Sequence, residues 1–154
     1  QIFPVSALIT ALLPRLTSMY NNDKTRTIHL MKKVQKAILF YGLVLSVPVL
    51  FFAPDMITII ANYPYTISIE TLRILFVSTI FVLANTVRVQ LFIIAGDFKT
   101  FSKIHIVWSI IGLLSVTYFT SVYSYSGLAW SISALEACIL ITTIIVQRLR
   151  GESI

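Results

Sequence analysis

Two ionisable residues, Arg88 and Glu136, lie inside long apolar runs and have the greatest potential for chemistry in this sequence. A charge at the centre of a lipid-spanning helix costs about 2.5–3.5 kcal/mol on insertion scales, so such residues indicate a functional site by default. The rise per residue of a helix places the two charges about 7 Å apart in depth. An ion pair between them is therefore possible but not required.

Polar residues recur on the same helical faces as these two charges. The face of Arg88 spans about 80° at roughly 100° per residue. It also carries Glu70, Ser78 and Asn85. The face of Glu136 has a similar width of about 80°. It also carries Ser133, Thr143 and Gln147. Two such faces predict helices that contact each other or that border shared water.

The two charges allow two interpretations. In the first, Arg88 extends to the cytoplasmic headgroups and Glu136 is hydrogen-bonded within the bundle, so both have structural roles. In the second, both border a cavity, where Arg88 attracts an anionic substrate group and Glu136 binds a proton or Na⁺. The cavity interpretation takes Arg88, Asn85, Arg73 and Ser78 as substrate-binding candidates and Glu136 as the ion-coupling candidate. For Arg73, a surface pair with Glu70, one turn away, is the simpler alternative.

Catalytic and metal-binding motifs are absent from the sequence. The two His residues and one Cys form no pattern of metal ligands, and the single Cys138 leaves no partner for an intrachain disulfide. No GxSxG, P-loop or GxGxxG motif occurs, and Asp55 and Asp97 lack the paired Asp that a sugar-nucleotide enzyme needs for its metal. We therefore expect no enzyme activity, no metal and no cofactor.

The composition indicates that long apolar helices carry these residues. Hydrophobic residues make up 57% of the 154 and charged residues 12%, which is more apolar surface than a soluble domain can bury. We expect an all-α integral membrane protein, a multi-helix bundle with residues 1–154 in a single membrane domain fragment. The predicted helices, most of them long enough to span a bilayer, cover residues 1–16, 33–53, 70–95, 100–119 and 127–147. The first is expected to be the end of a helix that starts upstream.

Breaker and amphipathic patterns set the expected limits of these helices. Pro54 is expected to end the second helix. Ser126 and Gly127 are expected to form the turn before the last helix. Residues 17–36 form an amphipathic stretch that we expect along the headgroups, before the chain turns into the membrane.

Lys and Arg residues fall only in every other gap between the apolar runs, apart from Arg73 and Arg88. Short basic loops are retained in the cytoplasm, so this alternation predicts a multi-pass protein with its C-terminus cytoplasmic. The net charge of +6 follows the same pattern. It therefore needs no polyanion, and we expect the lipid bilayer rather than nucleic acid as the partner.

Short motifs near the predicted helix ends follow a pattern known from one family. They are Leu13-Pro14-Arg15-Leu16-Thr17, Leu50-Phe51-Phe52-Ala53-Pro54, Tyr65 with Ser68, Leu72-Arg73-Ile74-Leu75, Gln90 with Ala95-Gly96-Asp97, and Gly127-Leu128-Ala129. In these motifs nearly the whole chain resembles the C-terminal part of polysaccharide flippases. These are the Wzx-type transporters of O-antigen (lipopolysaccharide) or capsule repeat units, within the multidrug/oligosaccharidyl-lipid/polysaccharide (MOP) exporter superfamily.

The resemblance implies a fold and a function. It implies about twelve helices in two six-helix lobes, with this chain forming part of the C-terminal lobe of a MOP-type transporter fold beside a missing N-terminal lobe of the same protein. The family's substrate is an undecaprenyl-pyrophosphate-linked oligosaccharide, moved across the bacterial inner membrane by alternating access and often coupled to H⁺ or Na⁺. Arg88 is then the first candidate to meet the pyrophosphate or acidic sugars, and Arg73 the second.

Other functions stay open. A MATE-like drug/cation antiporter of the same superfamily would share the fold. A non-transporting membrane scaffold or assembly subunit would lack a matching lobe upstream. A membrane glycosyltransferase would need a large soluble loop with paired Asp residues.

Overall fold

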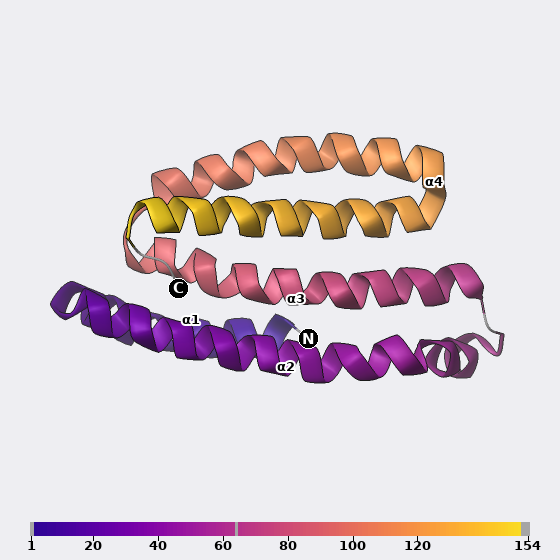
Figure 1. The fold of residues 1–154 in the computed structure, drawn as a ribbon, viewed down its shortest axis with the longest axis horizontal. Coiled ribbons are helices and arrows are strands. Elements are labelled where there is room, and N and C mark those ends of the chain that lie inside the picture. Colours follow the sequence, from indigo (N-terminus) through magenta and orange to yellow (C-terminus); the bar gives the residue numbers. More distant parts are fainter. Residues whose placement is uncertain (1, 64, 152–154) are drawn as a thin grey trace.

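The described residues form four helices that lie side by side along one long axis. The computed structural model describes residues 2–63 and 65–151. The helices are α1 (Ile2–Asn22), α2 (Lys24–Ala61), α3 (Thr66–Ile94) and α4 (Phe98–Leu149) (Figure 1). Throughout these ranges the chain is all-α, as its composition predicts.

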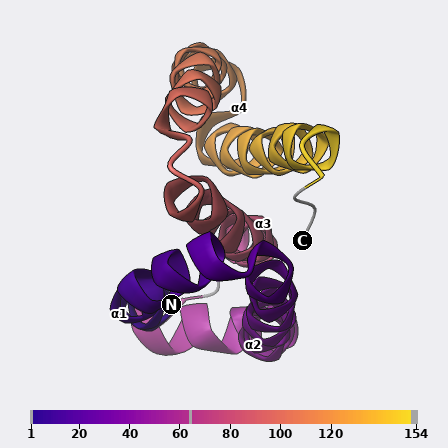
Figure 2. The same ribbon diagram turned by 90° about the vertical axis from the view of Figure 1, so that its left-hand side faces the viewer.

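Helix α3 forms the middle layer of the bundle. It packs against α1 and α2 on one side and against α4 on the other. Figure 2 looks along the bundle and shows α3 between the α1–α2 pair and the two halves of α4. Because α3 carries Arg88, its position decides which helices this charge can contact.

Helix α4 folds back on itself at one residue. Ser124 has φ 54° and ψ −136°, outside the helical region, and the two halves of α4 run side by side in opposite directions (Figure 1). Gly127 permits the close approach at this corner, because a Cβ there would lie 2.1 Å from the carbonyl oxygen of Phe119. The turn expected at Ser126 and Gly127 thus lies at Ser124, and helix occupies most of the expected loop.

Asp23 alone separates α1 from α2 and caps the second helix. Its carboxylate accepts a hydrogen bond from the backbone N–H of Arg26 at 2.9 Å, as an N-cap residue does. Helix α2 then continues for 38 residues, and its last turns bend away from the long axis of the bundle (Figure 1 and Figure 2). The expected turn of the 17–36 stretch into the membrane is therefore wrong. Its apolar spacing instead buries Met31 in a core with residues of α1 and α3.

Helix α2 continues through Pro54, where we expected it to end. A proline in a helix removes one backbone hydrogen bond, here the bond to the carbonyl of Leu50. That carbonyl accepts a hydrogen bond from Nε of Arg73 in α3 at 3.0 Å. The helix ends only at Ala61, and Asn62 follows in the left-handed conformation (φ 55°) of a C-cap.

Small residues bring α2 and α3 into close contact. A Cβ on Gly42 would lie 2.6 Å from Cδ1 of Leu83. One turn further along α2, the hydroxyl of Ser46 donates a hydrogen bond to the carbonyl oxygen of Phe76 at 3.0 Å. Small residues at a helix contact let the backbones approach, which is typical of membrane bundles.

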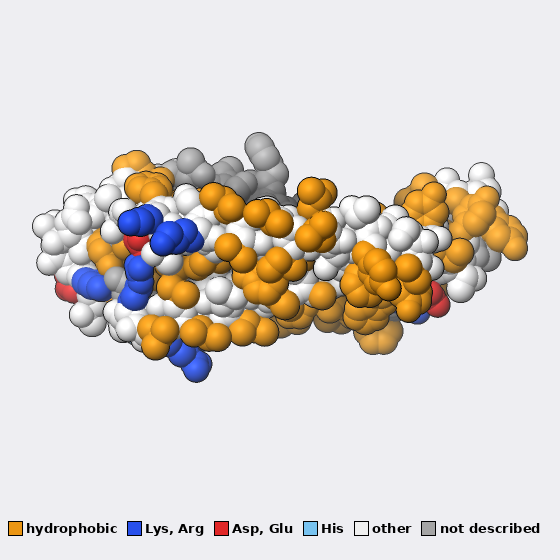
Figure 3. Space-filling model, turned by 90° about the horizontal axis from the view of Figure 1, so that it is seen from above, with side chains coloured by type: hydrophobic (Ala, Val, Ile, Leu, Met, Phe, Trp, Pro, Cys, Tyr) orange, Lys and Arg blue, Asp and Glu red, His pale blue; other side chains and the backbone are white. Residues whose placement is uncertain are grey.

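The outer surface of the bundle is largely apolar. Of the described helices, α2, α3 and α4 are long and apolar enough to cross a membrane. Large side chains point outward from them, among them Phe51, which is 73% exposed. Figure 3 shows hydrophobic side chains over much of one long face. Soluble monomers rarely expose apolar patches of this extent, so this surface is that of a membrane protein.

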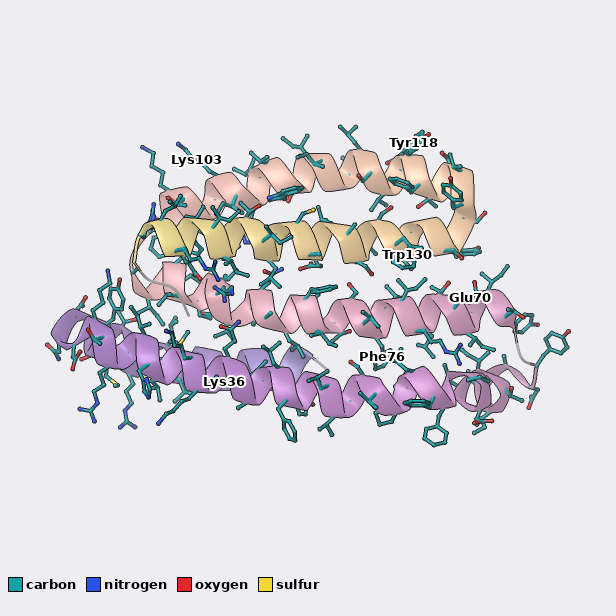
Figure 4. All side chains as sticks on the ribbon, viewed as in Figure 1. Lys36, Glu70, Phe76, Lys103, Tyr118 and Trp130 are labelled. Atoms are coloured by element: carbon teal, nitrogen blue, oxygen red, sulfur yellow. The ribbon has the colours of Figure 1, made fainter. Side chains whose placement is uncertain are left out.

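Basic side chains gather at one end of the bundle. Figure 3 shows most of the Lys and Arg residues of one face at this end, and Figure 4 places Lys36 and Lys103 toward it and Glu70 toward the other. The carboxylate of Asp97 forms an ion pair here with Arg150. Partial burial acts to raise the pKa of Asp97, but hydrogen bonds from Thr100 and the charge of Arg150 outweigh it and lower that pKa. The ion pair ties the two ends of α4 together.

We expect Gly127→Ala to destabilise the α4 hairpin by about 1–3 kcal/mol, the usual cost of overpacking. The added Cβ would meet rigid backbone at Phe119. Gly112→Ala is the control, because its added Cβ would meet only side-chain atoms of Leu135. The substitution also raises the helix propensity at this position. Thermal unfolding of the purified protein in detergent measures both. Equal melting temperatures for the two variants would contradict the role of Gly127.

Candidate functional site

The polar faces of α3 and of the second half of α4 meet. Four residues form hydrogen bonds between these helices: Asn85 and Arg88 of α3, and Glu136 and Gln147 of α4. We call these four residues the polar seam. Contact between the helices is the first of the two arrangements that the sequence pattern predicts.

Arg88 and Gln147 bind each other in both directions. Nη1 of Arg88 donates to Oε1 of Gln147 at 2.7 Å, and Nε2 of Gln147 donates to the backbone carbonyl of Arg88 at 3.0 Å. Arg88 is 6% exposed and Gln147 is 1% exposed. The guanidinium therefore lies inside the helix contact in the structure. The sequence placed Gln147 on the predicted polar face but did not identify it as the partner of Arg88.

Asn85 and Glu136 form the second pair of the seam. Its side-chain amide donates to Oε2 of Glu136 at 2.9 Å and to the backbone carbonyl of the same residue at 3.0 Å. Asn85 is buried, whereas Glu136 is half-buried. The Glu136 carboxylate thus accepts a hydrogen bond from a neutral donor and remains partly exposed.

Arg73 has a structural contact that the sequence analysis missed. We expected either a surface pair with Glu70 or contact with substrate. Its side chain instead reaches across to α2 and donates to the carbonyl of Leu50, which Pro54 leaves without a helical donor. The signal was present in the sequence as a proline within a long apolar run, but its partner on another helix was not predictable.

Ser78 lies on α3 but has no hydrogen bond to the seam. It is 2% exposed, and within the described part of the chain its hydroxyl oxygen has no hydrogen-bond partner. Glu70, on the same predicted face, is exposed. The structure therefore brings Asn85, Arg88 and Glu136 into one contact and leaves Ser78 and Arg73 outside it.

Four cavities bounded by described residues lie away from the seam. The largest of four has a volume of about 460 Å³ and lies between α1 and α2. A second, of about 310 Å³, separates the two halves of α4, and two more lie near Tyr65 and Tyr125. None of these four is lined by Arg73, Ser78, Asn85, Arg88 or Glu136. Over the same residues, no group of three or more His, Cys, Asp or Glu side chains could hold a metal ion.

Comparison of the chain with protein-family models, with curated proteins and with solved structures finds no match in any of the three.

The bond between Arg73 and Leu50 predicts a rescue. Arg73→Leu leaves a partly buried carbonyl unpaired and is expected to cost about 1–3 kcal/mol. Pro54→Ala restores the helical N–H donor to Leu50, so Arg73→Leu in the Pro54→Ala background is expected to cost less. Unfolding free energies of the wild type, the two single variants and the double variant, measured in mixed detergent, give the coupling energy between the two positions. A cost of Arg73→Leu that is the same in both backgrounds would contradict this pairing.

The seam predicts a second non-additive pair. Gln147→Leu removes one acceptor of a buried guanidinium and is expected to cost about 1.5–3 kcal/mol. Arg88→Leu combined with Gln147→Leu removes both partners and is expected to recover much of that loss. Thr143→Val is the matched control, because the buried Thr143 hydroxyl bonds only within its own helix, to Ile139. If Gln147→Leu costs no more than Thr143→Val, the seam does not join the helices.

Proposed function

We propose that the chain is the C-terminal part of a flippase that moves undecaprenyl-pyrophosphate-linked oligosaccharides across a bacterial inner membrane for surface polysaccharide synthesis. The resemblance of its short motifs supports the substrate class. Apolar helices and a common basic end support a multi-pass membrane orientation with the C-terminus in the cytoplasm. The observation that carries the proposal is the polar seam, because ionisable groups held at cost among apolar helices are typical of transport proteins.

In this proposal α3 and α4 move together as part of one lobe. The hydrogen bonds of Arg88 and Asn85 to α4 favour a unit that keeps its internal packing. Alternating access then comes from rocking of this unit against the N-terminal lobe, as in transporters built from two similar halves. The four seam residues act in holding the unit together, and Glu136 has an additional role.

Glu136 is the proposed ion-coupling residue. Its carboxylate is half-buried and accepts a hydrogen bond from the neutral amide of Asn85. The carboxylate is partly exposed, and the donor of its hydrogen bond is neutral. In this proposal it binds H⁺ or Na⁺ in one conformation and releases the ion in another. Ion binding changes the net charge of the seam and so can bias the two conformations.

Glu136→Gln tests the coupling directly. The amide oxygen of Gln can still accept the hydrogen bond from Asn85, so folding should be retained while the ionisable group is lost. We expect ion-driven flipping by the full-length protein to fall about tenfold or more, the effect of about 1.4 kcal/mol lost from a coupled step. Surface polysaccharide in a complemented deletion strain, at matched protein levels, provides the measurement.

Glu70→Gln is the matched control, since the same chemical change is made at an exposed carboxylate of α3. Normal flipping by Glu136→Gln would remove the coupling role. The deletion strain itself tests the substrate class. Accumulation of lipid-linked repeat units supports the flippase, and increased drug sensitivity alone supports the antiporter. The absence of both phenotypes supports a scaffold.

A further inference from the structure

The largest described cavity lies between α1 and α2, near the Asp23 junction at the basic end of the bundle. From α1 it is lined by Leu12, Arg15, Leu16 and Met19, and from α2 by Arg26, His29, Leu30, Lys33 and Val34. The α2 residues follow the spacing of one helical face. Because Arg15, Arg26, His29 and Lys33 are exposed, the cavity opens to the surroundings.

The basic side chains of this cavity outnumber the acidic groups near it. Within the described ranges, no acidic residue lines the cavity, and no ion pair engages Arg15, Arg26 or Lys33. The neighbouring acid, Asp23, caps α2 through its carboxylate and keeps its negative charge, so it offsets at most one of the positive charges. Three permanent positive charges and one imidazole therefore surround a hollow of about 460 Å³.

The same hollow has an apolar wall. Leu16 is buried, Leu12 and Val34 are partly buried, and the exposed Leu30 borders the opening. A ligand that matches both halves must combine an anion with a hydrocarbon chain. The part of α2 before Pro54 is about 45 Å long against a hydrocarbon layer of about 30 Å, which is long enough for its basic first turns to lie at the level of the headgroups.

We propose that this cavity is a binding site for an anionic phospholipid of the surrounding bilayer. The phosphate lies among Arg15, Arg26, His29 and Lys33, and the start of an acyl chain lies along the leucine wall. Arginine forks bind phosphate in bidentate fashion, and basic pockets between membrane helices hold anionic headgroups. This site is separate from the polar seam and does not depend on the transported substrate.

The retention of basic loops in the cytoplasm explains why Lys and Arg occur in this segment, but it sets no requirement on which side of α2 they occupy. Lys32 and Lys36 satisfy that rule equally well, and they do not line the cavity. The convergence of Arg15 from one helix with Arg26 and Lys33 from the next is the feature that favours a site.

Binding of phosphatidylglycerol to the purified full-length protein tests the proposal. The protein is placed in phosphatidylcholine nanodiscs and titrated with phosphatidylglycerol, and affinity is read by native mass spectrometry. Arg15→Gln with Arg26→Gln is expected to weaken binding about 25-fold, a factor of about five for each basic side chain. Lys32→Gln with Lys36→Gln removes the same charge from the same end and is expected to weaken binding less than about threefold through screened attraction alone.

Two further arms keep the test decisive if the double variant folds poorly. Phosphatidylglycerol with a photoreactive group near its headgroup should label the wild-type protein within residues 12–34. Leu30→Gln should weaken binding of the lipid but leave binding of glycerol phosphate unchanged, which separates a lipid from a free phosphate.

Three results would overturn the site. Equal loss from the two charge-matched variants would reduce the interaction to general surface attraction. Labelling confined to other helices would place the lipid elsewhere. Glycerol phosphate binding as tightly as phosphatidylglycerol would identify a small anion, not a lipid, as the occupant.

Discussion

A polar group inside a membrane bundle needs a partner within the protein, because hydrocarbon supplies no hydrogen bonds. This constraint explains the principal contacts between the helices. Pro54 leaves the carbonyl of Leu50 without its helical donor, and Arg73 of the neighbouring helix supplies one. Arg88 and Asn85 meet the same requirement through Gln147 and Glu136. Polar side chains of α3 therefore form hydrogen bonds with both α2 and α4.

The periodicity of the sequence was enough to predict the two polar faces and the all-α bundle. Spacing alone placed Asn85 and Arg88 on one face and Glu136 and Gln147 on another, and the structure brings these four together. A helical wheel works here because the apolar background is nearly uniform, so each polar side chain is a clear marker of direction. The wheel could not decide whether the faces meet each other or a cavity, because that depends on helices distant in the sequence.

The errors of prediction share one physical origin. Pro54 and residues 17–36 were interpreted from local preferences, whereas contacts from other helices decide both. The donor from Arg73 makes the proline tolerable, and the burial of Met31 against α1 and α3 keeps the basic stretch within α2. The turn lies at Ser124 and not at the expected Ser126 and Gly127. Gly127 is required there for close approach to Phe119 and not for the turn itself.

The seam also sets a condition on any transport role of Arg88. An arriving phosphate would replace the neutral oxygen of Gln147 with a charged acceptor, and charge-assisted hydrogen bonds are roughly twice as strong as neutral ones. The exchange is therefore not opposed by the strength of the bond. It is opposed by access, since Arg88 is 6% exposed within the contact of α3 and α4. Arg88 can meet an anion only in a conformation that parts these helices, whereas the Glu136 carboxylate is already half-exposed beside the same contact.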